Sequence, residues 1–304
     1  MPFPTTNAGP QWLTGVSQCF PEFKFPQDTF GHGSQLNSQI NSFSDAVICL
    51  SGGMDSTSLL LHLLAKGCRV RALSFDYGQK HKLELECVRR NLELLKSKKQ
   101  AVEWDLIDVS AIGNLFHSAL LNDEWEVPTG HYEKEQMKAT VVPNRNAIFA
   151  SIAYGYALSL ATKANAPAAL ALGVHRGDHA IYPDCRPVFY EALQRAFELG
   201  NWDSDQVLFH LPYLEWDKAM ILQEAKQSCD KLALEFNEIF SNTLTSYSPD
   251  PSGVSSGITG SDVERILAFD KLGIEDPIRY QEPWPQVVQR ARELEKEYRE
   301  SNSN

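Results

Sequence analysis

A glycine-rich turn follows the first strongly apolar run of the chain. The run covers 46–50, and the turn reads Ser51-Gly52-Gly53-Met54-Asp55-Ser56, directly before a helix predicted over 55–66. Glycines let a backbone turn tightly and approach a ligand, and a helix start offers free N–H groups and a positive dipole end. Ser51 and Ser56 add hydroxyl donors, and Asp55 can hold Mg²⁺ between phosphates. Any tight strand-to-helix turn can use two glycines, but this combination predicts a phosphate-binding loop.

The second polar stretch ends the next predicted strand, 69–75. It reads Ser74-Phe75-Asp76-Tyr77-Gly78-Gln79. Ligands of open α/β sheets sit outside the carboxyl ends of the strands. Asp76 there can accept a hydrogen bond from a ribose or bind magnesium, and Tyr77 can stack or donate. An ordinary exit from a strand explains the same residues equally well.

The third stretch stands at the start of an apolar helix predicted over 145–163. It reads Val142-Pro143-Asn144-Arg145-Asn146. Arg145 can neutralise phosphate charge through two parallel hydrogen bonds, and Asn146 can read a base edge or a carbonyl group. A merely polar helix start is the competing interpretation.

The fourth stretch gathers His, Asp, Tyr and Arg side chains in one loop. Residues 173–187 read GVHRGDHAIYPDCRP, after a predicted strand and before a predicted helix. Such a loop is a natural surface for reading a ligand. Metal binding by His175, Asp178 and His179 is a weaker interpretation of the same residues.

Strand and helix patterns alternate from residue 46 onward, which predicts an α/β fold with a doubly wound parallel sheet covered on both faces. Residues 110–142 are an irregular insertion, and 241–261 are a loop rich in Ser, Gly, Pro and Thr. The predicted strands cover 46–50, 69–75, 104–107, 168–174 and 207–211. The predicted helices cover 55–66, 79–97, 145–163, 186–199, 217–228, 262–271 and 286–300.

Composition excludes several classes of protein. The 304 residues are 43% hydrophobic and carry a net charge of −11, which suits a folded core and disfavours a grip on nucleic-acid phosphates. No run approaches the roughly 18 apolar residues of a membrane span, and the N-terminus lacks a signal-peptide pattern. The six cysteines form no C-x-x-C pair, which favours free thiols. We expect a soluble cytoplasmic protein without nucleic-acid or membrane partners.

The four stretches, in this order and spacing, resemble the QueC family of 7-cyano-7-deazaguanine synthases among the PP-loop ATP pyrophosphatases. The family patterns SGG-[LM]-DS, S-F-D-Y-G-Q, V-P-x-R-N and Y-P-D-C-R-P stand intact over about 46–270, and Pro212 with Lys218 matches a later proline–lysine pattern. The resemblance implies a doubly wound sheet of the adenine nucleotide alpha-hydrolase (HUP, PP-loop) type with a C-terminal helical segment. We accordingly expect an N-terminal arm over 1–44, a PP-loop domain over 45–235 and C-terminal loop and helices over 236–304.

The resemblance also implies an activity. The family uses ATP, and we expect Mg²⁺ with it, to adenylate the carboxylate of 7-carboxy-7-deazaguanine before a nitrogen nucleophile attacks; with ammonia the product is the nitrile preQ0. The expected catalytic residues are Ser51, Asp55, Ser56, Arg145 and Lys218. The residues expected to bind the nucleotide are Ser51, Gly52, Gly53, Asp55, Ser56, Asp76, Tyr77 and Gln79. The residues expected to bind the deazaguanine are Asn146, His179, Tyr182, Asp184 and Arg186.

The chain departs from the family at its zinc site. The family holds zinc with four cysteines in T-x-S-C-Y and C-G-x-C-x-x-C, followed by an Arg. The matching positions here are Ser246, Ser256, Thr259 and Asp262, with Arg265 retained. Hydroxyl groups are poor zinc ligands, so we expect no zinc.

Two products remain open. The chain could be a nitrile synthase, or a QueC-like ligase that attaches the deazaguanine to a protein amine, as is thought for QueC-like proteins of antiviral gene clusters. The missing cysteines and the extra arm suit an altered acceptor. A tRNA-modifying PP-loop enzyme fits the acidic charge poorly, and a non-catalytic nucleotide sensor fits the intact loop poorly. The resemblance also implies a homodimer.

Overall fold

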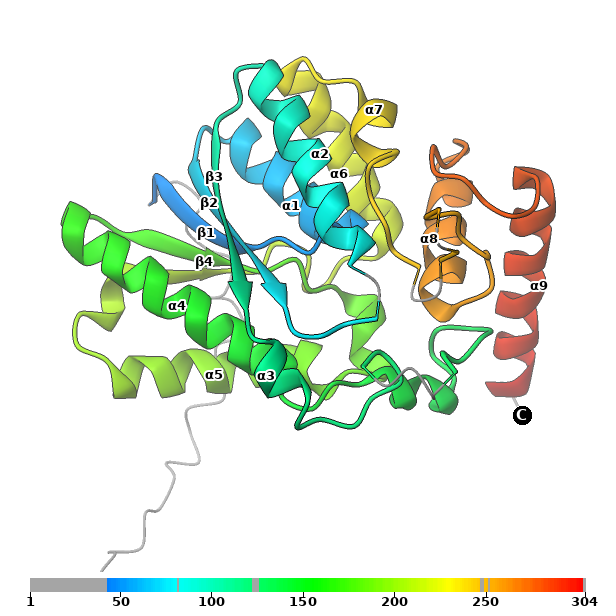
Figure 1. The fold of residues 1–304 in the computed structure, drawn as a ribbon, viewed down its shortest axis with the longest axis horizontal. Coiled ribbons are helices and arrows are strands. Elements are labelled where there is room, and N and C mark those ends of the chain that lie inside the picture. The colour runs from blue at the N-terminus through cyan, green and yellow to red at the C-terminus, as the bar shows by residue number, and fades with distance from the viewer. Residues whose placement is uncertain (1–42, 81, 122–125, 247–248, 251, 303–304) are drawn as a thin grey trace, which may run out of the picture. The chain divides into compact units, whose positions relative to one another are not determined.

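Five parallel strands form one sheet in the order β3-β2-β1-β4-β5 (Figure 1). The computed structural model describes residues 43–80, 82–121, 126–246, 249–250 and 252–302. Most of the expected arm, 1–44, therefore lies outside the described residues. The strands are β1 Asp45–Cys49, β2 Arg69–Asp76, β3 Val102–Asp108, β4 Ala168–Ala171 and β5 Val207–His210.

Helices cover both faces of the sheet, as predicted. Alternate residues of β1 point to opposite faces, and Ile48 belongs to one core cluster while Val47 belongs to the other. The first face is covered by α1 Met54–Ala65, α2 Leu83–Ser97, α6 Lys218–Leu232 and α7 Phe236–Phe240. The second face is covered by α4 Arg145–Ala164 and α5 Pro187–Gly200. The doubly wound α/β fold is confirmed.

The C-terminal helices α8 Gly260–Lys271 and α9 Trp284–Asn302 pack against each other. Val263 and Val287 are fully buried between them. Phe269, on α8, belongs to the core under α6, so α8 joins the C-terminal pair to the sheet domain. The division of the chain at 235 stays a prediction. None of the described helices is long and apolar enough to cross a membrane.

Several predicted bounds were wrong for local reasons. The helix expected from residue 79 begins at Leu83, because the Gln79 side chain folds back to accept from Tyr77 N and donate to Phe75 O. The strand expected to reach residue 174 ends at Ala171, where its partner β5 also ends. The edge strand β3 covers 102–108, which is longer than the predicted 104–107. Its exposed polar residues interrupt the apolar run on which the prediction was based.

The insertion 110–142 is not wholly irregular, because it contains α3 Ser110–Gly113 and the 3₁₀ helix η3 Glu135–Thr140. Residues 130–131 contact the C-terminal segment. Gly130 N donates to Ile258 O at 2.8 Å, and His131 Nε2 lies 2.6 Å from a carboxylate oxygen of Glu295. The other 3₁₀ turns are η4 Arg176–Ala180, η5 Pro183–Cys185 and η6 Ser204–Gln206.

Candidate active site

The loop between β1 and α1 is shaped by its own hydroxyl groups. Ser51 N donates to Ser56 Oγ at 3.2 Å, the two Oγ atoms are 3.0 Å apart, and Gly53 N donates to Ser51 Oγ at 3.2 Å. Gly52 has φ +88°, and a Cβ there would lie 2.2 Å from the backbone oxygen of Glu84. Only glycine fits that position. No side chain caps the N-terminus of α1, so its first N–H groups can receive an anion.

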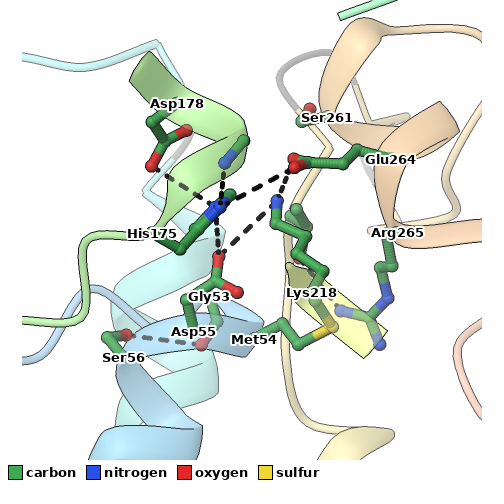
Figure 2. A network of polar contacts seen from close by, with 12 residues as sticks. Gly53, Met54, Asp55, Ser56, His175, Asp178, Lys218, Ser261, Glu264 and Arg265 are labelled. Carbon is green, nitrogen blue, oxygen red and sulfur yellow. Dashed lines mark hydrogen bonds and ion pairs between the residues drawn. The ribbon is translucent and has the colours of Figure 1, made fainter. Parts of the chain in front are cut away.

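A lysine and two carboxylates meet beside this loop (Figure 2). Lys218 opens α6 and is only 6% exposed, and its Nζ lies 2.5 Å from Glu264 Oε2 and 3.6 Å from Asp55 Oδ2. Burial lowers the pKa of Lys218, but the carboxylates outweigh it and the pKa is raised above its ordinary value. Lys218 is therefore a fixed positive charge. Oδ1 of Asp55 is buried without a hydrogen-bond partner among the described residues.

His175 lies next to the same two carboxylates, Asp55 and Glu264 (Figure 2). It is 1% exposed, and its Nε2 lies 3.3 Å from Asp178 and 3.7 Å from Asp55. Its Nδ1 lies 3.8 Å from Glu264 Oε1. Burial lowers the pKa of His175, but the three carboxylates together raise it above its usual value. Two carboxylates, one from α1 and one from α8, thus contact both the imidazole and the lysine.

A cavity of about 300 Å³ lies at the carboxyl ends of the strands, bounded by this cluster. β1 and β4 are neighbours in the sheet, but the helices that follow them, α1 and α5, cover opposite faces. Open α/β sheets bind ligands at such a point, where the order of the strands reverses. Opposite the loop, Arg145 lies 5.7 Å from the ring centre of Tyr77. Tyr132 and Met137 of the insertion complete the wall.

The predicted site residues divide into two groups. Those that line the cavity are Ser51, Gly53, Asp55, Ser56, Tyr77, Gln79, Arg145, Asn146, Tyr182 and Lys218. Those that do not line it are Gly52, Asp76, His179, Asp184 and Arg186. Asp76 is held outside by Lys82 at 2.5 Å, and Arg186 Nε donates to His179 O at 2.8 Å. The role of each residue stays a prediction.

Sequence reasoning missed Glu264 and Glu84. Glu84, on α2, lines the cavity, and burial raises its pKa to about 7 although Arg145 opposes the rise. Nothing in the sequence around Glu84 marks it. For Glu264 a signal existed, because Thr259 and Asp262 form a capping box that starts α8 two residues earlier than predicted. The pattern [ST]-x-x-[DE] would have shown this helix start.

The four positions matched to the family's zinc ligands do meet in space, around a carboxylate. Asp262 is fully buried. Its Oδ1 accepts from Ser255 Oγ at 2.6 Å. Its Oδ2 accepts from Ser246 Oγ at 3.1 Å, Ser256 Oγ at 3.3 Å, Thr259 Oγ1 at 2.8 Å and Thr259 N at 3.2 Å. One hydrogen-bonded anion occupies the place at which the four side chains converge.

A buried ion pair holds the adjoining loop. Arg265 and Asp276 are both fully buried at their charged ends, with Nε to Oδ2 at 2.6 Å and Nη2 to Oδ1 at 2.9 Å. Nη1 of Arg265 donates to Thr243 at 2.8 Å and Thr245 at 3.0 Å. Arg265 therefore ties the loop around residues 243–245 to α8.

Comparison with known proteins matches this arrangement to one family. The family model described as "Queuosine biosynthesis protein QueC" covers residues 45–273. The chain belongs to the QueC family. The 7-cyano-7-deazaguanine synthase of Hahella chejuensis is 44% identical over 236 residues, which are 78% of this chain and 93% of that protein. The 7-cyano-7-deazaguanine synthase 1 of Colwellia psychrerythraea is 41% identical over 235 residues, 77% of this chain and 98% of that protein. With its loop after β1, this QueC-family chain is an ATP-using enzyme.

Proposed function

We propose that this QueC-family enzyme adenylates the carboxylate of 7-carboxy-7-deazaguanine with ATP and transfers the acyl group to nitrogen. The single observation that carries the proposal is the uncapped, glycine-turned loop at the start of α1, with the buried Lys218 beside it. The names of the relatives support the deazaguanine substrate, and both relatives align over nearly their whole length.

The residues of the cavity suit an adenylation. The N–H groups at the start of α1 and the hydroxyl groups of Ser51 and Ser56 would hold phosphates of ATP. Lys218 and Arg145 would stabilise the charge that develops on the α-phosphate and the leaving pyrophosphate, which is the main demand of such a reaction. Asn146 and Tyr182, across the cavity, would position the base.

The residues present fit Mg²⁺ but do not fit zinc. The Asp55 carboxylate keeps one oxygen without a hydrogen bond, and carboxylates are ligands that Mg²⁺ prefers. Asp55 would hold the ion, which supplies positive charge to the phosphates. The residues matched to the zinc ligands do not fit zinc, because three are hydroxyl groups that already donate to Asp262, and zinc sites are built from thiolate, imidazole and carboxylate.

The experiment is incubation of the protein with ATP, Mg²⁺ and 7-carboxy-7-deazaguanine, with and without ammonium, followed by mass spectrometry of small molecules and protein. We expect AMP and pyrophosphate only when the carboxylated base is present. A free amide or nitrile would identify ammonia as the nucleophile, whereas a protein carrying the deazaguanine mass would identify a protein amine. Base-independent hydrolysis of ATP, or none, would refute the proposal.

A pair of variants ties the result to the site. Asp55→Asn keeps the shape of the side chain but removes the charge beside Lys218, and should lower AMP formation by about a hundredfold to a thousandfold. Asp230→Asn makes the same change on an exposed position of α6 and should leave it unchanged. Equal rates in the two variants would show that the loop is not the phosphate site.

A further inference from the structure

Among the described residues, four carboxylates line the cavity, and each has different neighbours. They are Asp55, Glu84, Asp178 and Glu264. Asp55 belongs to the phosphate loop. Asp178 is 3.3 Å from the His175 imidazole. Glu84 is buried, which raises its pKa to about 7 and weakens it as an anion. Glu264 alone comes from the C-terminal helices and reaches across to the sheet domain.

The two oxygens of the Glu264 carboxylate have different surroundings. Its Oε2 lies 2.5 Å from Lys218 Nζ. Its Oε1 lies 3.8 Å from Nδ1 of His175, which is too far for a hydrogen bond. Oε1 also packs closely against the backbone of Gly177, because a Cβ on that glycine would lie 2.0 Å from Oε1. The carboxylate is therefore fixed in place at the cavity wall, and its Oε1 accepts no hydrogen bond from the residues that the structure describes.

Lys218 links the position of Glu264 to the phosphate loop. Lys218 lies between Asp55 of the phosphate loop and Glu264 (Figure 2). A phosphate held by the loop and by Lys218 would therefore lie a few ångströms from Glu264. His175 is a poor alternative base, because its Nδ1 already accepts from Gly177 N at 3.0 Å and its Nε2 faces two carboxylates.

We propose that Glu264 binds the protonated nitrogen nucleophile and takes its proton; this rests on the proposed acyl transfer. An ammonium ion, or a protonated primary amine, gives one proton to Glu264, which passes it to solvent. The neutral nitrogen then attacks the acyl carbon and forms the C–N bond. Its surplus proton goes to Glu264, and the C–O bond to AMP breaks with the electron pair on the phosphate oxygen. Atoms and charges balance without a further reactant.

The test separates the two half-reactions in Glu264→Gln. Adenylation is measured as pyrophosphate exchange into ATP that depends on 7-carboxy-7-deazaguanine. Transfer is measured with ammonium, with glycinamide as a primary amine, and with hydroxylamine, which is uncharged at neutral pH. We expect exchange within about threefold of the parent, an ammonium- and amine-dependent rate lower by about a hundredfold or more, as for loss of a general base, and hydroxamate formation preserved. The relative rates with ammonium and glycinamide in the parent distinguish a free from a tethered amine.

Asp270→Asn is the matched control, because Asp270 is also on α8 and ion-paired, to Arg292 at 2.7 Å, away from the cavity. Gly177→Ala is the second variant. Its methyl group would lie 2.0 Å from Oε1 and 2.8 Å from Cε1 of His175, so it must displace Oε1 most, without removing the charge, and should show the same split even if Glu264→Gln does not fold. Exchange that falls as far as transfer would overturn the inference and make Glu264 a partner of Lys218 only. Unchanged transfer would also overturn it, whereas a parent without base-dependent exchange would overturn the proposed function as well.

Discussion

Replacing Asp262 with asparagine keeps the size of a fully buried side chain but removes its charge. Four of the five donors point at Oδ2, so the asparagine oxygen should take that place and its amide the place of Oδ1. The bond with Ser255 must then reverse, with the amide donating to the Ser255 oxygen, which leaves the hydroxyl proton of Ser255 without this acceptor. The four others change from charge-assisted to neutral, a loss of about 1 kcal/mol each. Relief from burying a charge offsets part of this, leaving about 2–3 kcal/mol.

Thermal unfolding measures the result. A loss of this size should lower the Tm by roughly 4–6 °C for a domain of this length. Asp250→Asn is the control, because Asp250 also accepts from one serine hydroxyl and two backbone N–H groups but lies at the surface, where water replaces them. We expect that variant within about 0.5 kcal/mol of the parent. Equal stabilities of the Asp262 and Asp250 variants would refute the reasoning.

The converse change tests the geometry. Three hydroxyl oxygens lie within 3.3 Å of one Asp262 oxygen, so four thiolates at these positions should surround one metal ion. A variant with cysteine at Ser246, Ser256, Thr259 and Asp262 should bind one zinc per chain and lose stability with a chelator. The parent should keep its Tm and activity in chelator at fixed Mg²⁺. One tightly bound zinc in the parent would contradict the expectation that this centre binds no zinc.

Three further outcomes follow from the cavity. Asp55→Ala should lower AMP formation by about a hundredfold to a thousandfold with an unchanged circular dichroism spectrum; near-normal turnover would contradict its role. Gly52→Ala, at φ +88° and with a Cβ 2.2 Å from the Glu84 backbone oxygen, should lose ATP binding in calorimetry and at least about 1–2 kcal/mol of stability. Because burial raises the pKa of Glu84 to about 7, the folded state keeps a proton that the unfolded state gives up, so stability should fall as pH rises from about 4.5 to about 7. Glu84→Gln should remove that slope in urea titrations, and a slope that persists would assign it to another group.

The sheet and its helices could be predicted from the sequence because each strand is a short apolar run closed by a turn, and the two faces follow from alternation. The predicted ends of helices were wrong where a side chain hydrogen-bonds to the backbone, as Gln79 does before α2. The phosphate loop could be predicted because the residues that shape it, Ser51 to Ser56, are consecutive in the sequence. The capping pattern could have shown where α8 starts. It could not show that Glu264 meets Lys218, which is 46 residues away by numbering, 264 minus 218, because only packing of α8 brings the two together.

The hydrogen-bonded centre around Asp262 and the proposed amine site are linked through the start of α8. Asp262 and Glu264 are two residues apart on this helix, so their side chains point about 200° apart at 3.6 residues per turn. One side chain is fixed by the serine and threonine hydroxyl groups, and the other reaches Lys218 across the cavity. The capping box of Thr259 and Asp262 fixes where the helix begins. A carboxylate in place of a metal can therefore keep the same helix start, and with it the direction in which Glu264 points.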